Sequence, residues 1–346
     1  MGSDLILDTL LLPYTQGLLE WPSQGGVLFM RACFGQALDC VPRDRLQCVQ
    51  SFKPWADELR AAGYLVEAGE RVGDAQAATV LLLLPRQREE ARALLAQAMQ
   101  RVLPEGYVLA AQFNNEGARS GEADLARLAG AAQSLSKHKA RVFWAQAQAT
   151  AACDRALLAE WAELDAPRRI AEGRFISRPG LFAWSRIDAA SALLARCLPE
   201  DLHGRGADLG AGFGYLAAEV LERCQQVVAM DLYEAEARGL ALARQNLVAV
   251  GDRTLDFIWH DVTTGLLPER RYDFIVSNPP FHQGRADQPE IGKAFIRAAA
   301  RALVAGGRFW LVANRHLPYE EVLQREFRKV RVVAVEQGFK VIEAIR

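Results

Sequence analysis

The chain of 346 residues predicts two α/β domains, the second of which is a doubly wound, mainly parallel sheet. Three observations support this fold class. Short apolar runs alternate with helical patterns through the C-terminal half, a glycine-rich turn follows the first of these runs, and the chain ends in two strand-like segments joined by a tight turn. A hydrophobic fraction of 51% is ample for two cores.

The first predicted strand of the second domain runs into Asp208 and then into a Gly-x-Gly-x-Gly turn formed by Gly210, Gly212 and Gly214. A helical pattern follows over residues 215–224. Glycine lets the backbone turn tightly and approach a ligand closely. This order of strand, glycine turn and helix is typical of sites that bind a nucleoside cofactor.

Two more acidic residues close strand-like segments. The apolar run 226–231 ends in Asp231, where a carboxylate is expected to accept the ribose hydroxyls of the cofactor. Asp261 closes another apolar segment, where it is expected to reach an adenine amino group. Acids at three successive strand ends favour a binding site over a set of isolated helix caps.

A fourth strand, residues 272–276, leads into Asn278-Pro279-Pro280-Phe281. Consecutive prolines forbid both a helix start and a continued strand ladder, so the chain is expected to be stiff and extended just past the strand end. The Asn278 side chain and the backbone carbonyls of Asn278 and Pro279 offer acceptors for an amino group, and Phe281 offers a stacking face. This combination suits a planar ring that carries an exocyclic NH2.

The remaining elements of the second domain follow from apolar spacing and from glycine stops. Helices are expected over 189–197, 233–250 and 291–303, and strands over 309–314, 330–336 and 340–345, the last two forming a hairpin.

The order of glycine turn, ribose acid, adenine acid and Asn-Pro-Pro-Phe resembles the class I S-adenosylmethionine (SAM) methyltransferases that act on planar amino groups. Four further segments resemble the RsmC family of small-subunit ribosomal RNA guanine-N2 methyltransferases: residues 277–284, 179–188, 312–319 and 338–345. The chain departs from this family at Ala183-Trp184-Ser185, a difference that concerns the contacts of that loop and not the chemistry.

This resemblance implies SAM as the cofactor, with Asp208 organising the glycine turn and the methionine amino group. It also implies a Rossmann-like methyltransferase sheet with C-terminal hairpin strands and a degenerate methyltransferase-like domain before it. A weak internal repeat agrees with the second point, because residues 78–85, 89–102 and 104–111 echo the strand, helix and strand around the Asn-Pro-Pro-Phe run. The N-terminal copy lacks the glycine turn. We place the domains at residues 1–165 and 166–346.

A net charge of −1 gives no support for nucleic-acid binding by the chain as a whole, so RNA contact is expected from local clusters. One is the arginine group Arg168, Arg169, Arg174, Arg178 and Arg186, and the other is the segment 136–141. The six cysteines are scattered without a Cys-x2-Cys pair, which disfavours a metal site. With neither a signal peptide nor an apolar span, we expect a cytoplasmic protein without membrane association.

Three alternatives stay open on these residues. The Asn-Pro-Pro-aromatic run also serves methylation of adenine N6, of protein glutamine, and of guanine in large-subunit ribosomal RNA. A non-catalytic RNA-binding factor on a methyltransferase scaffold and a nicotinamide-dependent dehydrogenase are the competitors from other classes.

Overall fold

The computed structural model describes residues 2–68, 76–147, 154–248, 251–280, 282–283, 286–287 and 289–346. The chain divides into two compact units. Residues 1–167 and 178–180 form the first domain, and residues 168–177 and 181–346 form the second domain. No helix in the described ranges is both long and apolar enough to cross a bilayer.

The second domain is built on a seven-stranded sheet of order β12-β11-β10-β13-β16-β18-β17, in which β18 alone runs opposite to the other six strands. Its elements are β8 (Arg168–Ile170), η4 (Ala171–Gly173), β9 (Phe175–Ser177), α7 (Ala189–Cys197), β10 (His203–Leu209), α8 (Tyr215–Arg223), β11 (Gln226–Glu234), α9 (Ala237–Asn246), β12 (Thr254–Trp259), η5 (Val262–Thr264), β13 (Tyr272–Ser277), β14 (His282–Gln283), β15 (Ala286–Asp287), α10 (Pro289–Ala302), β16 (Leu303–Asn314), α11 (Glu320–Glu326), β17 (Lys329–Glu336) and β18 (Phe339–Ile345).

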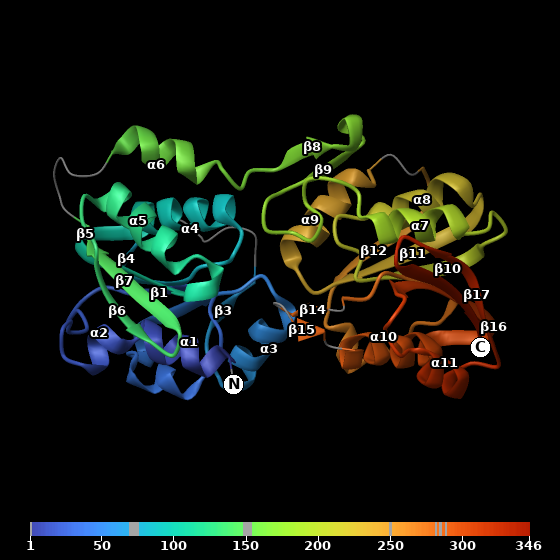
Figure 1. Cartoon of the computed structure of the whole chain (residues 1–346), viewed down its shortest axis with the longest axis horizontal. Helices are drawn as coiled ribbons and strands as arrows, with labels where there is room; N and C mark the ends of the chain where they lie inside the picture. Colours follow the sequence, from blue (N-terminus) through green and yellow to red (C-terminus); the bar gives the residue numbers. More distant parts are fainter. Residues whose placement is uncertain are drawn as a thin grey trace. The chain divides into compact units, whose positions relative to one another are not determined.

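Helices cover both faces of this sheet, as a doubly wound fold requires. Figure 1 shows α7, α8 and α9 on one face and α10 and α11 on the other. Alternate strand residues supply the two cores: Phe274 and Val276 pack with the first helix group, and Ile275 with the second. The carboxyl ends of β10, β11, β12 and β13 therefore meet along one edge of the sheet.

One predicted boundary is wrong. The helix expected over 233–250 begins only at Ala237, because β11 continues through Tyr233 and ends at Glu234. Leu232 and Tyr233 are fully buried in the sheet, and Tyr233 is paired with Leu209 of β10. Burial of these two side chains in the sheet overrides the helical spacing of the segment.

The first domain has a sheet with the same strand order, β3-β2-β1-β4-β5-β7-β6. Its elements are α1 (Gly2–Leu10), α2 (Leu12–Thr15), β1 (Val27–Met30), η1 (Gln36–Cys40), η2 (Arg43–Arg45), β2 (Leu46–Val49), α3 (Lys53–Ala61), β3 (Val66–Glu67), β4 (Ala77–Leu83), α4 (Arg88–Arg101), β5 (Val102–Phe113), η3 (Asn114–Glu116), α5 (Ala118–Ala129), β6 (Gln133–Lys137), β7 (Ala140–Gln146) and α6 (Arg155–Ala162).

The correspondence reaches individual residues. Strands β5 and β16 each have 12 residues with the same sequence of buried and exposed positions, and each shifts register against its parallel neighbour. Gly106 and Gly307 stand at the same position in these strands, and a Cβ on Gly106 would lie 2.5 Å from the backbone oxygen of Ala78. The two domains therefore share one topology and one local irregularity.

The first domain also includes a short returning segment. Arg178 is buried and its guanidinium pairs with the carboxylate of Asp165. Gly180 lies so close to Glu90 that a Cβ there would be 2.3 Å from a carboxylate oxygen. Residues 178–180 are thus part of the first domain, although the ten residues before them belong to the second.

Candidate functional site

The glycine turn follows β10 directly. Gly210, Gly212 and Gly214 all have positive φ, at 75°, 55° and 90°, which favours glycine at each position. A Cβ on Gly212 would have no neighbour within 4 Å, so the space beside this residue is open. In contrast, a Cβ on Gly239 of α9 would lie 3.2 Å from the Gly212 backbone oxygen, so α9 packs closely against the turn. Helix α9 therefore covers one side of the glycine turn, and the side beside the Gly212 Cβ position is open.

Asp208 lies one residue before the end of β10, and its side chain is fully buried. Its Oδ2 accepts a hydrogen bond from the Ala217 backbone N–H at 3.1 Å, and its Oδ1 has no partner among the described residues. Burial raises the pKa of this carboxyl from 3.8 to about 7. A buried carboxylate oxygen without a donor is an acceptor suited to a cationic amino group.

Asp231 does not lie at a strand end. It sits three positions before the end of β11, is fully buried, and accepts hydrogen bonds from Tyr272 Oη at 2.7 Å, Arg205 Nη2 at 2.8 Å and Arg270 Nη1 at 3.1 Å. Because the side chain is fully buried beneath these three donors, it has no surface open to a ligand. The predicted ribose role of Asp231 does not fit this geometry.

The residue at the end of β11 is Glu234. Its Oε2 accepts from the Gly212 N–H at 2.7 Å and its Oε1 accepts from the Glu236 N–H at 2.8 Å. Burial raises the pKa of this carboxyl above its usual range, against these backbone donors. Glu234 thus places a carboxylate against the glycine turn, where Asp231 was expected.

The sequence contained a signal for Glu234. The spacing from the glycine turn selects Asp231, but the apolar residues Leu232 and Tyr233 that follow it indicate that the strand continues. A strand ending at the next polar residue ends at Glu234.

Asp261 follows β12, as predicted, and caps η5. Its Oδ1 accepts from the N–H and the hydroxyl of Thr263, at 2.9 and 2.6 Å, and its Oδ2 takes part in neither bond. The preceding His260 bonds through Nε2 to the Gly265 carbonyl at 2.6 Å, and its ring stands edge-on to Tyr233. His260 therefore supports the loop that carries Asp261.

The Asn-Pro-Pro run begins one residue after β13. Ser277 Oγ donates to the Leu209 carbonyl at 2.7 Å, which fixes the end of β13 against the end of β10. A Cβ on Gly210 would lie 3.9 Å from the Asn278 backbone oxygen, so Asn278 adjoins the glycine turn. Pro279 is buried and Pro280 is exposed. Phe281 lies outside the described residues, and its stacking role stays a prediction.

The Asn278 side chain is half-buried and held from one side. Its Nδ2 donates to Asp188 Oδ2 at 3.0 Å and to Ser191 Oγ at 2.9 Å. The structure therefore brings together Asp208, the three glycines, Glu234 and Asn278 at the carboxyl edge of β10, β11 and β13. Such a site places an amide oxygen beside a loop suited to a nucleoside cofactor.

Comparisons with known proteins agree with this geometry. A model of the methyltransferase small domain matches residues 172–343. The ribosomal RNA small subunit methyltransferase C of Shewanella pealeana is 28% identical over 78% of this chain and 77% of its own length. A solved structure of the Thermus thermophilus 16S rRNA N2 G1207 methyltransferase RsmC, in complex with AdoMet and guanosine, covers 99% of this chain and 91% of its own, at a TM-score of 0.80 and 24% identity.

The chain belongs to the RsmC family. The predicted family, methyltransferase fold and enzyme class are confirmed, and the AdoMet in the Thermus structure agrees with the predicted cofactor. A second kind of relative is the ribosomal RNA large subunit methyltransferase G of Shewanella amazonensis, which is 35% identical over 48% of this chain and 44% of its own length.

In this RsmC-family protein, most of the predicted arginine cluster is engaged in the fold. Arg178 is buried against Asp165, Arg174 bonds Glu219 and Glu222 at 2.6 and 2.7 Å, and Arg168 lies over the Trp184 ring. Arg169 and Arg186 remain exposed. The cluster as predicted is therefore not a continuous basic surface.

The second predicted basic segment is partly neutralised as well. Arg141 pairs with Glu122, and His138 lies 3.8 Å from an oxygen of Asp8. Lys137 and Lys139 are exposed. Among the described residues, no group of three or more His, Cys, Asp and Glu side chains is placed to hold a metal ion.

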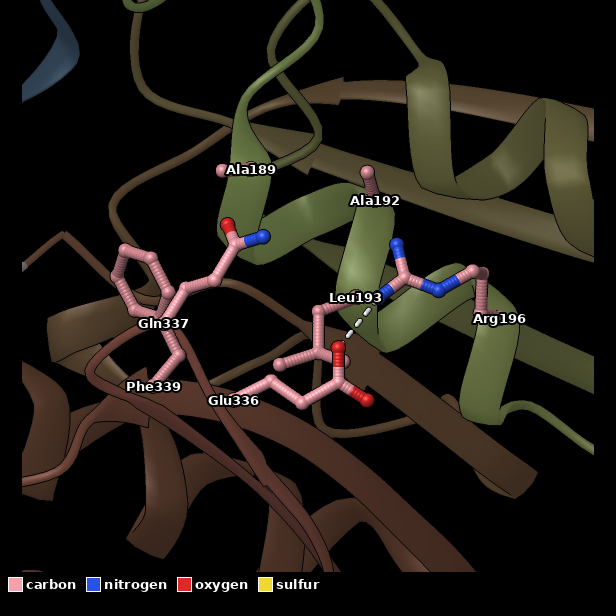
Figure 2. A pocket seen from close by; sticks show the side chains of 7 residues that line it. All are labelled: Ala189, Ala192, Leu193, Arg196, Glu336, Gln337 and Phe339. Atoms are coloured by element: carbon pink, nitrogen blue, oxygen red, sulfur yellow. Dashed lines mark hydrogen bonds and ion pairs between the residues drawn. The ribbon is translucent and has the colours of Figure 1, made fainter.

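A pocket of about 100 Å³ lies between α7 and the β17–β18 hairpin (Figure 2). The side chains that line it are Ala189, Ala192, Leu193, Arg196, Glu336, Gln337 and Phe339. An exposed ion pair at 2.9 Å joins Arg196 to Glu336 at its rim. In this RsmC-family fold, helix α7 thus contributes one face to the Asn278 site and another to this pocket.

Proposed function

We propose that this chain transfers a methyl group from SAM to the exocyclic N2 of a guanine in small-subunit ribosomal RNA. The single observation that carries the proposal is the Asn278 amide, whose Nδ2 is bonded to Asp188 and Ser191 so that its Oδ1 is the group left for a ligand. A substrate that donates from a planar NH2 group matches this acceptor. The RsmC family and the guanosine bound in the Thermus 16S rRNA methyltransferase support the choice of guanine and of the small subunit.

The cofactor supplies a methyl group on a sulfonium that is already a good leaving group. The residues present fit this group. The open space at Gly212 accommodates it, Glu234 accepts the ribose hydroxyls, Asp261 Oδ2 accepts from the adenine amino group, and the unpartnered Asp208 Oδ1 accepts from the methionine ammonium. Each of these roles needs only an acceptor oxygen at a strand end.

The weak partner of the reaction is the nitrogen nucleophile, because its lone pair is delocalised into the guanine ring. Hydrogen bonds from the NH2 group to Asn278 Oδ1 and to the Pro279 carbonyl favour a more tetrahedral nitrogen. The same two dipoles stabilise the positive charge that develops on that nitrogen during transfer. The base leaves its stack to reach the site, and Phe281 is the residue proposed to receive its ring.

A second candidate keeps the chemistry and changes the substrate to large-subunit ribosomal RNA. The relative from Shewanella amazonensis favours it, since its 35% identity over 48% of the chain equals within one per cent the 34% of a small-subunit relative from Shewanella piezotolerans over the same share. The Asn278 geometry suits either substrate. With either substrate the enzyme works on ribosomal RNA, and hence in the cytoplasm.

The test offers labelled SAM and the purified chain three substrates in parallel: naked small-subunit rRNA, assembled small subunits and large-subunit rRNA. The modified nucleoside is then identified by chromatography. Label in N2-methylguanosine from the small-subunit samples is expected. Label only in large-subunit rRNA selects the second candidate, and label in N6-methyladenosine overturns the choice of guanine.

A further inference from the structure

The Asn278 amide is fixed by the first turn of α7, a helix outside the glycine turn and the ribose site. Asp188 is the N-cap of α7, and its Oδ2 accepts both the Ser191 N–H at 2.8 Å and the Asn278 Nδ2–H at 3.0 Å. Ser191 Oγ accepts the other Nδ2–H at 2.9 Å. Both hydrogens of the amide nitrogen are therefore used by residues of one helical turn.

The chemistry of Asp188 decides which way the amide points. A carboxylate can only accept hydrogen bonds, whereas an amide has a donating end and an accepting end. If the Asn278 amide turned over, its oxygen would face the Asp188 carboxylate and two acceptors would oppose each other. The carboxylate therefore holds Oδ1 on the side away from α7, where the described residues supply no donor to it.

We infer that Asp188, assisted by Ser191, is a positioning residue for methyl transfer, which orients the Asn278 carbonyl toward the amino group of the substrate. This inference rests on the proposed function of Asn278. Its physical basis is that an acceptor must be held close to its productive geometry to lower the barrier, and that loss of this orientation costs turnover more than binding.

The residues of α7 that line the neighbouring pocket are not the ones that contact Asn278. Ala189, Ala192 and Leu193 line the pocket together with residues of the β17–β18 hairpin (Figure 2). Asp188 and Ser191 are one turn apart and meet Asn278 instead. Substitutions at these two positions therefore leave the pocket lining unchanged.

The decisive variant is Asp188→Ser. Serine is a good N-cap, so the helix start is retained, but its short hydroxyl is also a donor and no longer fixes the amide. We expect kcat to fall about tenfold to a hundredfold, while the KM for RNA and the Kd for SAM stay at their wild-type values. Asp188→Asn keeps an acceptor oxygen at the same reach and should recover kcat to within about threefold of wild type.

A matched control exists in the first domain. Asp154 caps α6 by accepting from the Leu157 N–H at 3.0 Å, as Asp188 does for α7. Asp154→Ser makes the same chemical change at an N-cap away from the site, and its kcat should equal that of wild type. Thermal unfolding of both variants shows whether their folds are equally intact.

Equal kcat in Asp188→Ser and Asp154→Ser overturns the inference, and so does a loss of turnover that is matched by weaker SAM binding. If Asp188→Ser does not fold, Ser191→Ala decides, because it removes one acceptor and leaves the cap carboxylate in place. A reduced kcat with unchanged SAM affinity then supports the inference, and wild-type kcat overturns it. Failure of the proposed function is distinct, since wild-type protein would then form no N2-methylguanosine.

Discussion

The two domains place different residues on the same backbone positions. Strand register equates Met30 with Leu209 and Val49 with Tyr233, so Arg31 corresponds to Gly210 and Gln50 to Glu234. Gln50 Oε1 accepts from the Phe52 N–H at 2.8 Å, as Glu234 accepts from the Glu236 N–H. The first domain keeps the hydrogen bond that shapes the loop after the second strand, and it has lost the charge.

The two domains differ more strongly in the residues at the position of the glycine turn. Arg31 has φ 53°, the left-handed conformation that Gly210 also adopts, and its guanidinium bonds Glu90 at 3.1 Å. Glu90 is almost fully buried and lies against Gly180. Protein side chains thus gather beside the first domain's loop, whereas the space beside Gly212 is open. The fold survives such changes because its strands and core do not depend on them.

The largest expected effect is at Asn278, whose counterpart by register is the apolar Leu83. Asn278→Ala should lower kcat about a hundredfold to a thousandfold, since it removes a preorganised acceptor at the charge that develops in the transition state. SAM affinity measured by calorimetry should persist. Near-wild-type turnover would show that methyl transfer does not depend on the acceptor that distinguishes Asn278 from Leu83.

The Asp231 side chain is expected to stabilise the second domain more than its counterpart stabilises the first domain. Asp231→Ala removes the acceptor shared by Arg205, Arg270 and Tyr272, and should lower the free energy of unfolding by about 2–3 kcal/mol. This is below the cost for a fully buried pair because both arginine side chains are about 30% exposed.

The control for Asp231 is its counterpart in the first domain, Gln47, which bonds only Glu67 in the described structure. Gln47→Ala should cost less than about 1 kcal/mol, the value of one ordinary hydrogen bond. Urea unfolding measures both variants. An equal effect of the two substitutions would remove this distinction between the sheets.

Glu234→Gln converts the second domain to the residue found in the first. The amide oxygen can keep the hydrogen bond from the Glu236 N–H, but the amide nitrogen cannot accept from the Gly212 N–H and the charge is lost, so we expect the Kd for SAM to rise about tenfold. Calorimetry measures the change, and Gln50→Glu in the first domain should leave the binding of one SAM per chain unaltered. A Kd unchanged by Glu234→Gln would count against the proposed ribose role of Glu234.

The smallest effect concerns pH. The pKa of Asp208 is raised to about 7 in the ligand-free protein, and its counterpart by register is the apolar Phe29. A cationic ligand group favours the carboxylate, so SAM affinity should be constant above pH 7 and fall as the pH drops below it, by at most about tenfold per unit. Asp208→Asn should flatten this profile, and an unchanged profile would exclude Asp208 as its source.

The raised pKa of Asp208 also makes the folding stability depend on pH. The folded chain keeps the Asp208 proton up to about pH 7, while the unfolded chain releases it near its ordinary pKa of 3.8. The contribution of this carboxyl to stability therefore declines as the pH rises through that window.

Much of the fold and part of the candidate site could be predicted from local sequence patterns. Alternating apolar runs and glycine stops predict the second sheet, and the double proline after β13 marks the place of Asn278. Glu234 was missed because residue spacing from the glycine turn was given more weight than the apolar continuation of β11. The role of Arg178 was missed because its partner, Asp165, lies across a loop that carries no periodic signal. Asp188 belongs to a segment that resembles the family, but its contact with Asn278 spans 90 positions and is visible only in three dimensions.

The returning segment 178–180 bears on how the protein can be divided. Any single cut near residue 167 would leave Arg178 in one fragment and Asp165 in the other, so a guanidinium buried in the intact chain would lose its counter-ion. Gly180 would leave the first-domain fragment as well, uncovering the Glu90 carboxylate. The first domain is complete only when the chain has entered the second and come back, so a fragment that ends near residue 167 lacks part of the first domain.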